Sequence, residues 1–220
     1  SSQCGLAVPR QNGKNACLEL AELFKIVVLG RKVLHTAHEV KTARKAFLRL
    51  VSFFENERQW PELAALGTEV SRTNGQEALV LTNGGSVEFI ARSKGSGRGF
   101  TVDDLVLDEA QELSEDALAA LLPTISAAPS GDPQIIFTGT PPAPNMDGEV
   151  FTRVRENALK GKNKRACWDE WSFLAGIDLD VVGWVLMGAG LLGLIWSLVI
   201  MSMRRSEVVV DPQHSAAHVV

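Results

Sequence analysis

The chain has 220 residues, of which 45% are hydrophobic and 22% are charged, and it contains no tyrosine. This composition excludes an intrinsically disordered chain, a collagen-like repeat and a small disulfide-stapled protein. The formal net charge of −4 argues against a generally polycationic nucleic-acid binder. The charge is uneven, because residues 1–60 carry ten Lys or Arg against five Asp or Glu, whereas residues 101–116 hold seven acids and no base. The basic segment is suited to binding phosphate, and the acidic segment is suited to binding a metal ion. For both segments the alternative is an ordinary solvated surface.

Strands and helices are predicted to alternate along the first 160 or so residues. The predicted strands cover residues 5–9, 32–36, 78–81, 87–91, 104–107 and 134–138. The predicted helices cover residues 14–29, 39–57, 115–127 and 150–159. An Asn-Gly-Gly turn between the third and fourth strands predicts a β-hairpin. Strand–helix–strand order favours right-handed parallel connections, so we expect an α/β fold with a mostly parallel sheet and a β-hairpin insertion.

The C-terminal part of the chain is of a different kind. Residues 181–203 form a run of 23 residues without a charged side chain. At ~1.5 Å per residue, a helix of this length spans ~34 Å, which is enough to cross a bilayer. The run is apolar around its whole circumference, which favours a lipid-embedded helix, and a buried core helix is the alternative. We therefore expect a transmembrane-like helix over residues 181–203.

A candidate phosphate loop lies between the first predicted strand and the first predicted helix. Residues 8–15 read Val-Pro-Arg-Gln-Asn-Gly-Lys-Asn, and Gly13-Lys14 stands where the helix begins. A tight turn with its amides at a helix N-terminus, followed by a lysine, is the arrangement that binds nucleotide phosphates. The common pattern G-x-x-x-x-G-K-[ST] is not met, because Val8 and Asn15 stand at its first and last positions. A plain turn is the alternative.

Two further candidate segments follow predicted strands. Asp108 and Glu109 come directly after the apolar strand at 104–107, and Thr138-Gly139-Thr140 ends the strand at 134–138. An Asp that holds Mg²⁺ and a Glu that activates water are needed for phosphoryl transfer. Because ligands bind at the carboxyl ends of parallel strands, we expect all three segments to form one site.

Four segments together resemble the ATPase domain of a tailed-phage terminase large subunit, over about residues 5–172. They are residues 9–15, 34–39, 107–111 and 138–142. That family has a divergent phosphate loop of the Arg-Gln-x-Gly-Lys type, which accommodates Val8 and Asn15. The resemblance implies a helicase-like P-loop fold and a motor in the host cytoplasm that packages double-stranded DNA, with ATP and Mg²⁺ as cofactors. It also implies a terminase small subunit, a portal and a homo-oligomeric ring as partners.

The resemblance also implies roles for individual residues. The phosphate-binding set would comprise Arg10, Gln11, Asn12, Gly13, Lys14 and Asn15. Asp108, with Asn15 or a water, would hold Mg²⁺, and Glu109 would be the catalytic carboxylate. Thr138, Gly139 and Thr140 would contact the γ-phosphate region and couple hydrolysis to movement. A charge-stabilising arginine is also implied, with Arg10 in cis and Arg98 in trans as the two candidates.

The domain organisation follows from these two parts. We expect an N-terminally truncated ATPase domain at 1–172, a junction at 173–180, the membrane helix at 181–203 and a polar tail at 204–220. We expect this chain to lack the family's adenine-contacting segment and its nuclease domain, and we expect no nuclease activity. The C-terminal part resembles the second half of small two-helix bacterial membrane proteins of unassigned function. The favoured interpretation is an incomplete motor fused to a membrane helix; the alternatives are a membrane-anchored P-loop ATPase of a translocation system and a catalytically dead remnant.

Overall fold

The structure is a computed structural model, and the chain divides into two units, Ser1–Ser172 and Phe173–Val220. The residues that the structure describes are 2–66, 68–73, 75–93, 97–141, 148–161, 163–171, 187–189 and 191. Almost all of them belong to the first unit, which the following paragraphs describe by itself.

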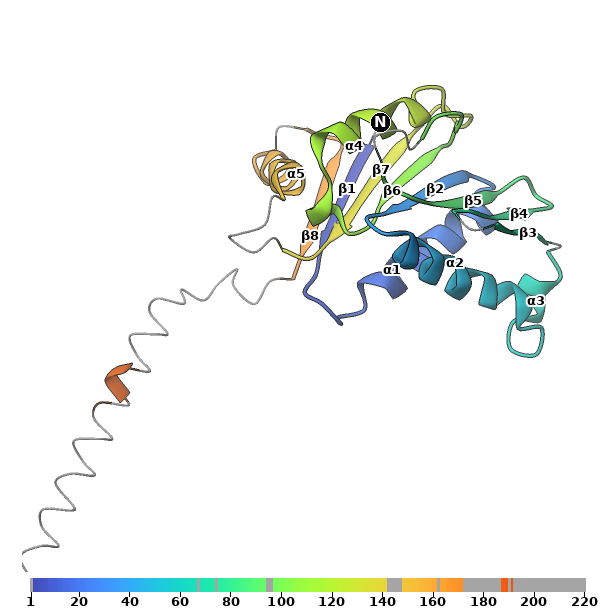
Figure 1. Ribbon diagram of the computed structural model, residues 1–220, viewed down its shortest axis with the longest axis horizontal. Coiled ribbons are helices and arrows are strands. Elements are labelled where there is room, and N and C mark those ends of the chain that lie inside the picture. The colour runs from blue at the N-terminus through green and yellow to red at the C-terminus, as the bar shows by residue number, and fades with distance from the viewer. Residues whose placement is uncertain are drawn as a thin grey trace, which may run out of the picture. The chain divides into compact units, whose positions relative to one another are not determined.

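A single sheet of eight strands runs through the first unit (Figure 1). The strands are β1 (Ser2–Ala7), β2 (Lys32–Ala37), β3 (Thr68–Thr73), β4 (Gln76–Leu81), β5 (Ser86–Ala91), β6 (Asp104–Leu107), β7 (Gln134–Gly139) and β8 (Ala166–Glu170). Their order across the sheet is β3-β4-β5-β2-β6-β7-β1-β8. The pairs from β5 to β8 are parallel, and the pairs that join β3, β4 and β5 are antiparallel. The predicted mostly parallel sheet and the predicted hairpin are therefore confirmed.

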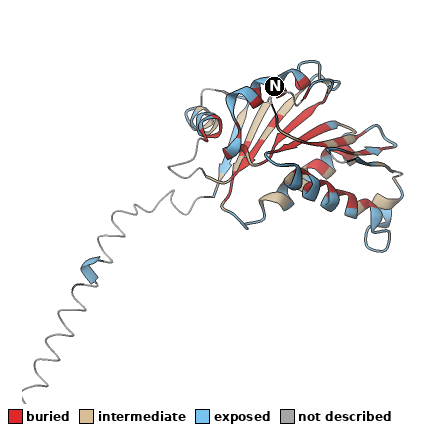
Figure 2. Cartoon of the chain, in the orientation of Figure 1, coloured by how far each residue is buried: buried red, intermediate tan, exposed pale blue. Residues whose placement is uncertain are grey.

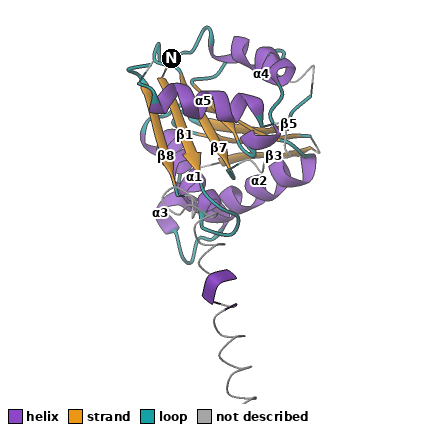
Figure 3. Cartoon of the chain, turned by 90° about the vertical axis from the view of Figure 1, so that its left-hand side faces the viewer, coloured by secondary structure: helices purple, strands orange, loops and turns teal. Residues whose placement is uncertain are grey.

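Helices cover both faces of this sheet. The helical segments are α1 (Lys14–Leu23), the π-helix η1 (Phe24–Val28), α2 (Val40–Glu55), α3 (Pro61–Ala64), the 3₁₀ helix η2 (Ala110–Glu112), α4 (Glu115–Leu121), the 3₁₀ helix η3 (Leu122–Ile125) and α5 (Glu149–Leu159). Helices α1 and α2 lie on one face, and α4 and α5 lie on the other (Figure 1). Figure 3 shows β8, β1 and β7 side by side at the end of the sheet near α5.

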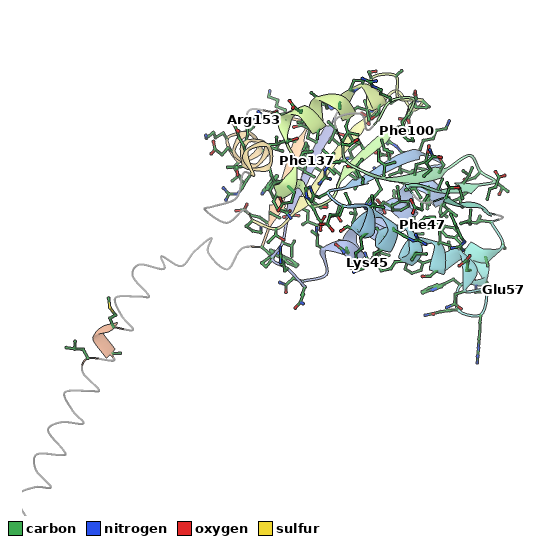
Figure 4. The ribbon with its side chains drawn as sticks, viewed as in Figure 1. Lys45, Phe47, Glu57, Phe100, Phe137 and Arg153 are labelled. Atoms are coloured by element: carbon green, nitrogen blue, oxygen red, sulfur yellow. The ribbon has the colours of Figure 1, made fainter. Side chains whose placement is uncertain are left out.

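The two faces carry separate hydrophobic cores, because side chains alternate along each strand. Val33 and Val106 pack with α2, whereas their neighbours Leu34 and Leu105 pack on the side of α4 and α5. Figure 4 labels one aromatic residue from each core, Phe47 on α2 and Phe137 on β7. Figure 2 shows that burial is concentrated on the central strands, and every residue of β6 and all but the first of β2 are buried. Burial on both faces is the usual condition of a parallel sheet.

The structure differs from the sequence-based expectations at several element boundaries. Strands β3 and β8 were not predicted, and β1 ends at Ala7, so that Val8 and Pro9 belong to the following loop. The helix predicted over 115–127 becomes α4 and then a 3₁₀ turn. Pro123 stands in that turn, where a residue without an N–H cannot continue the α-helical ladder. Strand β7 extends one residue beyond the prediction, to Gly139, whereas β6 has the predicted bounds of 104–107.

The predicted transmembrane-like helix over 181–203 lies almost wholly outside the described residues, as do the junction at 173–180 and the tail at 204–220. In the part of the chain that the structure describes, no helix has the length and apolar character needed to cross a bilayer. The assignment of residues 181–203 to a membrane therefore stays a prediction.

Candidate functional site

The loop between β1 and α1 turns through two left-handed residues. Gln11 has a φ of 65° and Gly13 a φ of 79°. The side-chain amide of Asn12 donates to the carbonyl of Arg10 at 3.1 Å, which braces the turn. Gly13 is the N-cap of α1, and because it has no side chain it cannot cap the helix. The first N–H groups of α1 therefore have no side-chain acceptor from the N-cap residue. Such a helix start favours an anion through its N–H groups and its dipole.

Lys14, the first residue of α1, reaches across to the end of β6. Its Nζ lies 2.6 Å from Oδ1 of Asp108. The same oxygen accepts the Thr138 hydroxyl at 2.9 Å and the backbone N–H of Glu109 at 2.8 Å. Burial by itself would raise the pKa of Asp108, but Lys14, His35 and the Thr138 hydrogen bond outweigh it and lower the pKa. Asp108 is therefore a buried, ionised carboxylate at neutral pH.

Glu109 follows Asp108 in an unusual backbone conformation. Its φ of 52° places a residue with a Cβ in the left-handed region, which few non-glycine residues occupy. Residues held in this way cluster at functional sites, where surrounding contacts keep the backbone in place. Glu109 is half-buried and lines the cleft described below, so the strain accompanies a carboxylate at an accessible surface.

The end of β7 lies between the two segments just described, because β7 pairs with both β1 and β6. Gly139 is buried, and a Cβ at this position would lie 2.8 Å from Oε1 of Gln111. The absence of a side chain lets Gln111 reach the backbone N–H of Thr140, which donates to Oε1 at 3.1 Å. The acidic turn and the Thr-Gly-Thr segment are thus linked by one hydrogen bond through Gln111.

These segments enclose one cleft of about 450 Å³. Its lining residues are Pro9, Arg10, Gln11, Asn12, Gly13, Lys14, Asn15, Glu109, Gln111 and Thr140. The structure therefore brings together the phosphate loop, the acidic turn and the end of β7, as expected for the carboxyl edge of a parallel sheet. Asp108 is not part of this lining, but it accepts hydrogen bonds from Lys14 and from Thr138.

The two candidate arginines lie in different places. Arg10 is exposed and lines the cleft. Arg98 is also exposed, but it lines a separate hollow of about 380 Å³ with neighbours from α4 and η3. Of these two arginines, Arg10 is therefore the one that can reach the cleft of its own molecule.

Two residues of the site were missed by sequence reasoning. Gln111 was part of a quoted motif but received no role, although it lines the cleft and contacts Thr140. Arg92 was assigned to a loop, yet its guanidinium donates to the backbone carbonyls of Asp108 at 2.5 Å and Glu109 at 3.0 Å. The one available signal was its position as the first residue after the strand predicted over 87–91.

Comparisons with known proteins gave results only at the level of fold. No protein-family model and no curated protein matches the sequence. Among solved structures, the large terminase of bacteriophage HK97 superposes with a TM-score of 0.67 and 16% identity, covering 81% of this chain and 37% of that one. The large terminase ATPase domain of Thermus phage P74-26 gives a TM-score of 0.58 and 18% identity, over 76% of this chain and 74% of that one.

The large terminase of another thermophilic bacteriophage, in complex with ADP, gives a TM-score of 0.52 and 14% identity, over 78% of this chain and 40% of that one. The chain thus spans about two fifths of the length of these two large terminases. At these identities the similarity establishes the fold and nothing finer. The first unit has the fold of phage large-terminase ATPase domains, as the sequence resemblance predicted.

Proposed function

We propose that this chain is the ATP-hydrolysing part of a terminase-type DNA-packaging motor. The observation that carries the proposal is the cleft lined by the 10–15 loop and Glu109, in which Lys14 is paired with the buried Asp108. Lysine, a metal-holding aspartate and a water-activating glutamate are the groups that nucleotide hydrolysis requires. Nucleotide as the ligand is supported by the large terminase of the thermophilic bacteriophage, which was solved in complex with ADP and with ATP-gamma-S.

Phosphate binding would begin with an exchange of partners at Lys14. Its ammonium group is largely buried against Asp108, with 15% of its side chain exposed toward the cleft. A phosphate held by the loop amides would offer Lys14 a second anion of higher charge, while Asp108 would keep its bonds from Thr138 and the Glu109 N–H. Arg10, Gln11, Asn12 and Gly13 would supply the remaining donors of the loop.

The residues present also suit a magnesium ion bound together with nucleotide. Mg²⁺ prefers oxygen ligands and usually combines one or two carboxylates with waters and phosphate oxygens. Asp108 is ionised, and Asn15 brings an amide oxygen to the cleft lining. No group of three or more His, Cys, Asp or Glu gathers among the described residues, so phosphate and water would provide the other ligands. Mg²⁺ would neutralise charge on the transferring phosphate.

Glu109 is the residue that we assign to the chemical step. Its carboxylate is in the cleft, where it would orient and deprotonate a water for attack on the terminal phosphate. Arg10 is the cis candidate for stabilising the developing charge. Arg98, in its separate hollow, would act only on the site of a neighbouring copy in a ring. The link from Gln111 to Thr140 would transmit the state of the acidic turn to Gly139 and Thr138.

The wider role is carried over from the resemblance. Double-stranded DNA, a small subunit, a portal and a ring of copies in the host cytoplasm are the partners and the setting that a terminase motor requires. Attachment to a membrane rests on the uncharged run at 181–203 alone. A protein that stays soluble at high yield without detergent would argue against a membrane-anchored form and against a remnant whose only working part is that helix.

The test is a pair of glutamine variants in the acidic turn. Glu109→Gln should lower kcat for ATP hydrolysis by about 10²- to 10⁴-fold and leave nucleotide affinity nearly unchanged, because only the proton acceptor is lost. Glu112→Gln is the matched control, since Glu112 is exposed and does not line this cleft. Unchanged hydrolysis in Glu109→Gln would remove Glu109 from the mechanism, and failure of the parent protein to bind ATP would contradict the proposal as a whole.

A further inference from the structure

Arg92 lies at the point where three neighbouring strands end. It is the first residue after β5, and its backbone N–H donates to the carbonyl of Ala37, the last residue of β2. Its guanidinium Nη1 donates to the carbonyl of Thr36 at 3.0 Å and to that of Asp108 at 2.5 Å. Its Nη2 donates to the carbonyl of Glu109 at 3.0 Å. One side chain thus joins the ends of β5 and β2 to the turn that follows β6.

The contacts of Arg92 distinguish it from a residue that binds phosphate. It does not belong to the residues that line the cleft, and the contacts given above occupy its guanidinium with backbone carbonyls. Burial lowers the pKa of Arg92 to about 10, opposed by the charges of Asp108, Glu109 and Glu112. At neutral pH the side chain is therefore a half-buried cation bonded to an acidic turn.

The turn that Arg92 contacts is the strained one. The φ of 52° at Glu109 is unfavourable for a residue with a Cβ. The N–H of Glu109 is held by Asp108 Oδ1 at 2.8 Å, and its carbonyl is held by Arg92 Nη2. Both sides of the Glu109 backbone are thus fixed by hydrogen bonds to charged groups, which are stronger than neutral ones.

We propose that Arg92 is a positioning residue that clamps the Asp108-Glu109 turn and thereby keeps the Glu109 carboxylate in the cleft. It acts through the backbone of Glu109 and does not touch the nucleotide. Its effect on hydrolysis rests on the proposed function, whereas its effect on the turn does not. The planar fork of the guanidinium is required, because a lysine ammonium is a single point that cannot span the carbonyls of Thr36, Asp108 and Glu109 together.

The test compares Arg92→Lys with Arg153→Lys. Arg153 is the matched control, because it is an exposed arginine on α5 that pairs with Glu115. In Arg92→Lys, kcat should fall about 10- to 100-fold, as expected for the loss of one or two charge-assisted hydrogen bonds. The KM and the affinity for ADP should stay within about threefold, because the phosphate loop is untouched. Arg153→Lys should match the parent in all three.

Hydrogen exchange followed by mass spectrometry provides a readout that does not depend on activity. Amides at residues 109–112 should exchange about tenfold faster in Arg92→Lys, while peptides from α2 and α5 keep their parental rates. A second variant, Glu109→Gly, removes the energetic penalty for a positive φ at this position. Arg92→Lys should therefore accelerate exchange in the turn much less when it is introduced into Glu109→Gly than when it is introduced into the parent protein.

The outcomes separate the clamp from the proposed function. Parental exchange in the turn of Arg92→Lys would overturn the clamp, and so would equal acceleration with and without Glu109→Gly. Faster exchange over the whole sheet, with a matching loss of ADP affinity, would show a merely structural arginine. If the parent hydrolyses no ATP, the proposed function fails, and the exchange measurements still decide whether Arg92 holds the turn.

Discussion

Strand β6 carries an aspartate at each end, and the two ends behave differently. Asp104 begins the strand and lies 2.8 Å from Nζ of Lys25, in η1. Asp108 follows the strand and lies 2.6 Å from Nζ of Lys14, at the start of α1. A lysine–aspartate pair thus appears at both edges of the sheet, with its lysine from one of the consecutive helices α1 and η1.

The difference lies in what surrounds each pair. Asp104 is fully buried and has a second cation, with Nε of Arg31 at 2.7 Å, and Lys25 also donates to the Gln134 side chain at 2.5 Å. The pair at Asp108 borders a cleft of about 450 Å³ that a ligand can enter. The enclosed pair at Asp104 joins secondary-structure elements, whereas under the proposed function the pair at Asp108 would exchange its lysine with an anion that enters the cleft.

Backbone strain follows the same division. Gln11 and Glu109, the two non-glycine residues with a positive φ among the described residues, both lie at the carboxyl edge. At the amino edge, the Asp103 side chain simply accepts the backbone N–H groups of Lys32 at 2.9 Å and Ser130 at 2.6 Å. A strained backbone conformation persists where surrounding contacts stabilise it. Here it occurs at the edge of the sheet where we propose that ATP is hydrolysed.

The largest effect on stability is expected from Asp104→Asn. This change leaves the buried Lys25 and the half-buried Arg31 beside a neutral amide, which should lower the free energy of unfolding by about 3–5 kcal/mol. Urea unfolding measures the loss. Asp132→Asn is the control, because its pairing with Arg165 is exposed and should contribute less than about 1 kcal/mol. A similar small loss in both variants would contradict a fastening role for Asp104.

Removal of either lysine tests the comparison most directly. Lys14→Met should weaken ADP binding about 10- to 100-fold, because a charged partner of the phosphates is lost. Lys25→Met should lower stability and leave the ADP affinity of the folded protein within about threefold. Titration with a fluorescent nucleotide, combined with urea unfolding, gives both quantities. If Lys25→Met weakened binding as strongly as Lys14→Met, the two edges would not be functionally distinct.

Gly139→Ala should have a moderate effect on the carboxyl edge. The new Cβ would lie 2.8 Å from Oε1 of Gln111 and 2.9 Å from Cζ of Phe151, an overpacking that costs about 1–3 kcal/mol. It should also separate Gln111 from the Thr140 N–H and slow ATP hydrolysis. Gly131→Ala is the control, because its φ of 71° and open surroundings add only a backbone cost. Hydrolysis that is slowed equally in both variants would argue against the Gln111 link.

The smallest expected effect is a pH dependence at His35. This residue is buried on β2, with Nδ1 2.6 Å from Oε1 of Glu22 in α1. Burial by itself would lower the pKa of His35, but the charge and hydrogen bond of Glu22 outweigh it and raise the pKa above 6.5. Because the folded state then holds the proton more tightly, this stabilisation is complete below the unfolded pKa of about 6.5 and is lost as pH rises through the folded pKa.

Urea unfolding at about pH 6 and about pH 9 measures that dependence. The parent and His38→Gln, which changes an exposed histidine, should lose the same amount of stability as pH rises. His35→Gln should lose less over that interval. Burial also raises the pKa of the Cys4 thiol, so only the difference between the two variants reports on His35. Equal slopes in all three proteins would remove the ion pair from the explanation.

Much of the candidate site was predictable because its parts lie at strand ends. Lys14, Asp108, Glu109 and Thr138 each follow an apolar run at short range, and parallel pairing brings such ends to one edge. Gln111 and Arg92 were not predictable in the same way. Their roles depend on side chains that reach backbone groups of other segments, at Thr140 and at Glu109, and no local pattern encodes such a contact.

The edges of the sheet show the same limit. Strand β3 is polar and largely exposed, and β8 alternates between half-buried and exposed residues, so neither contains the apolar run by which a buried strand is recognised. Pairing with β4 and β1 makes them strands. The central strands could be predicted from sequence without knowledge of their pairing, because burial on both faces requires a continuous apolar run.

The sequence by itself determined the alternation of elements, the mostly parallel sheet and the identity of the residues that meet at its carboxyl edge, because these follow from hydrophobic periodicity and turn chemistry. The tertiary structure decided which charged pairs are enclosed and which border a cleft. It also decided that Glu109 takes a left-handed backbone with Arg92 bound to its carbonyl. The physical reason is that the burial of a side chain, and its accessibility to a ligand, depend on how segments far apart in the chain pack. In the sequence alone, Asp104 and Asp108 are both aspartates at an end of the same apolar strand, and nothing local distinguishes them.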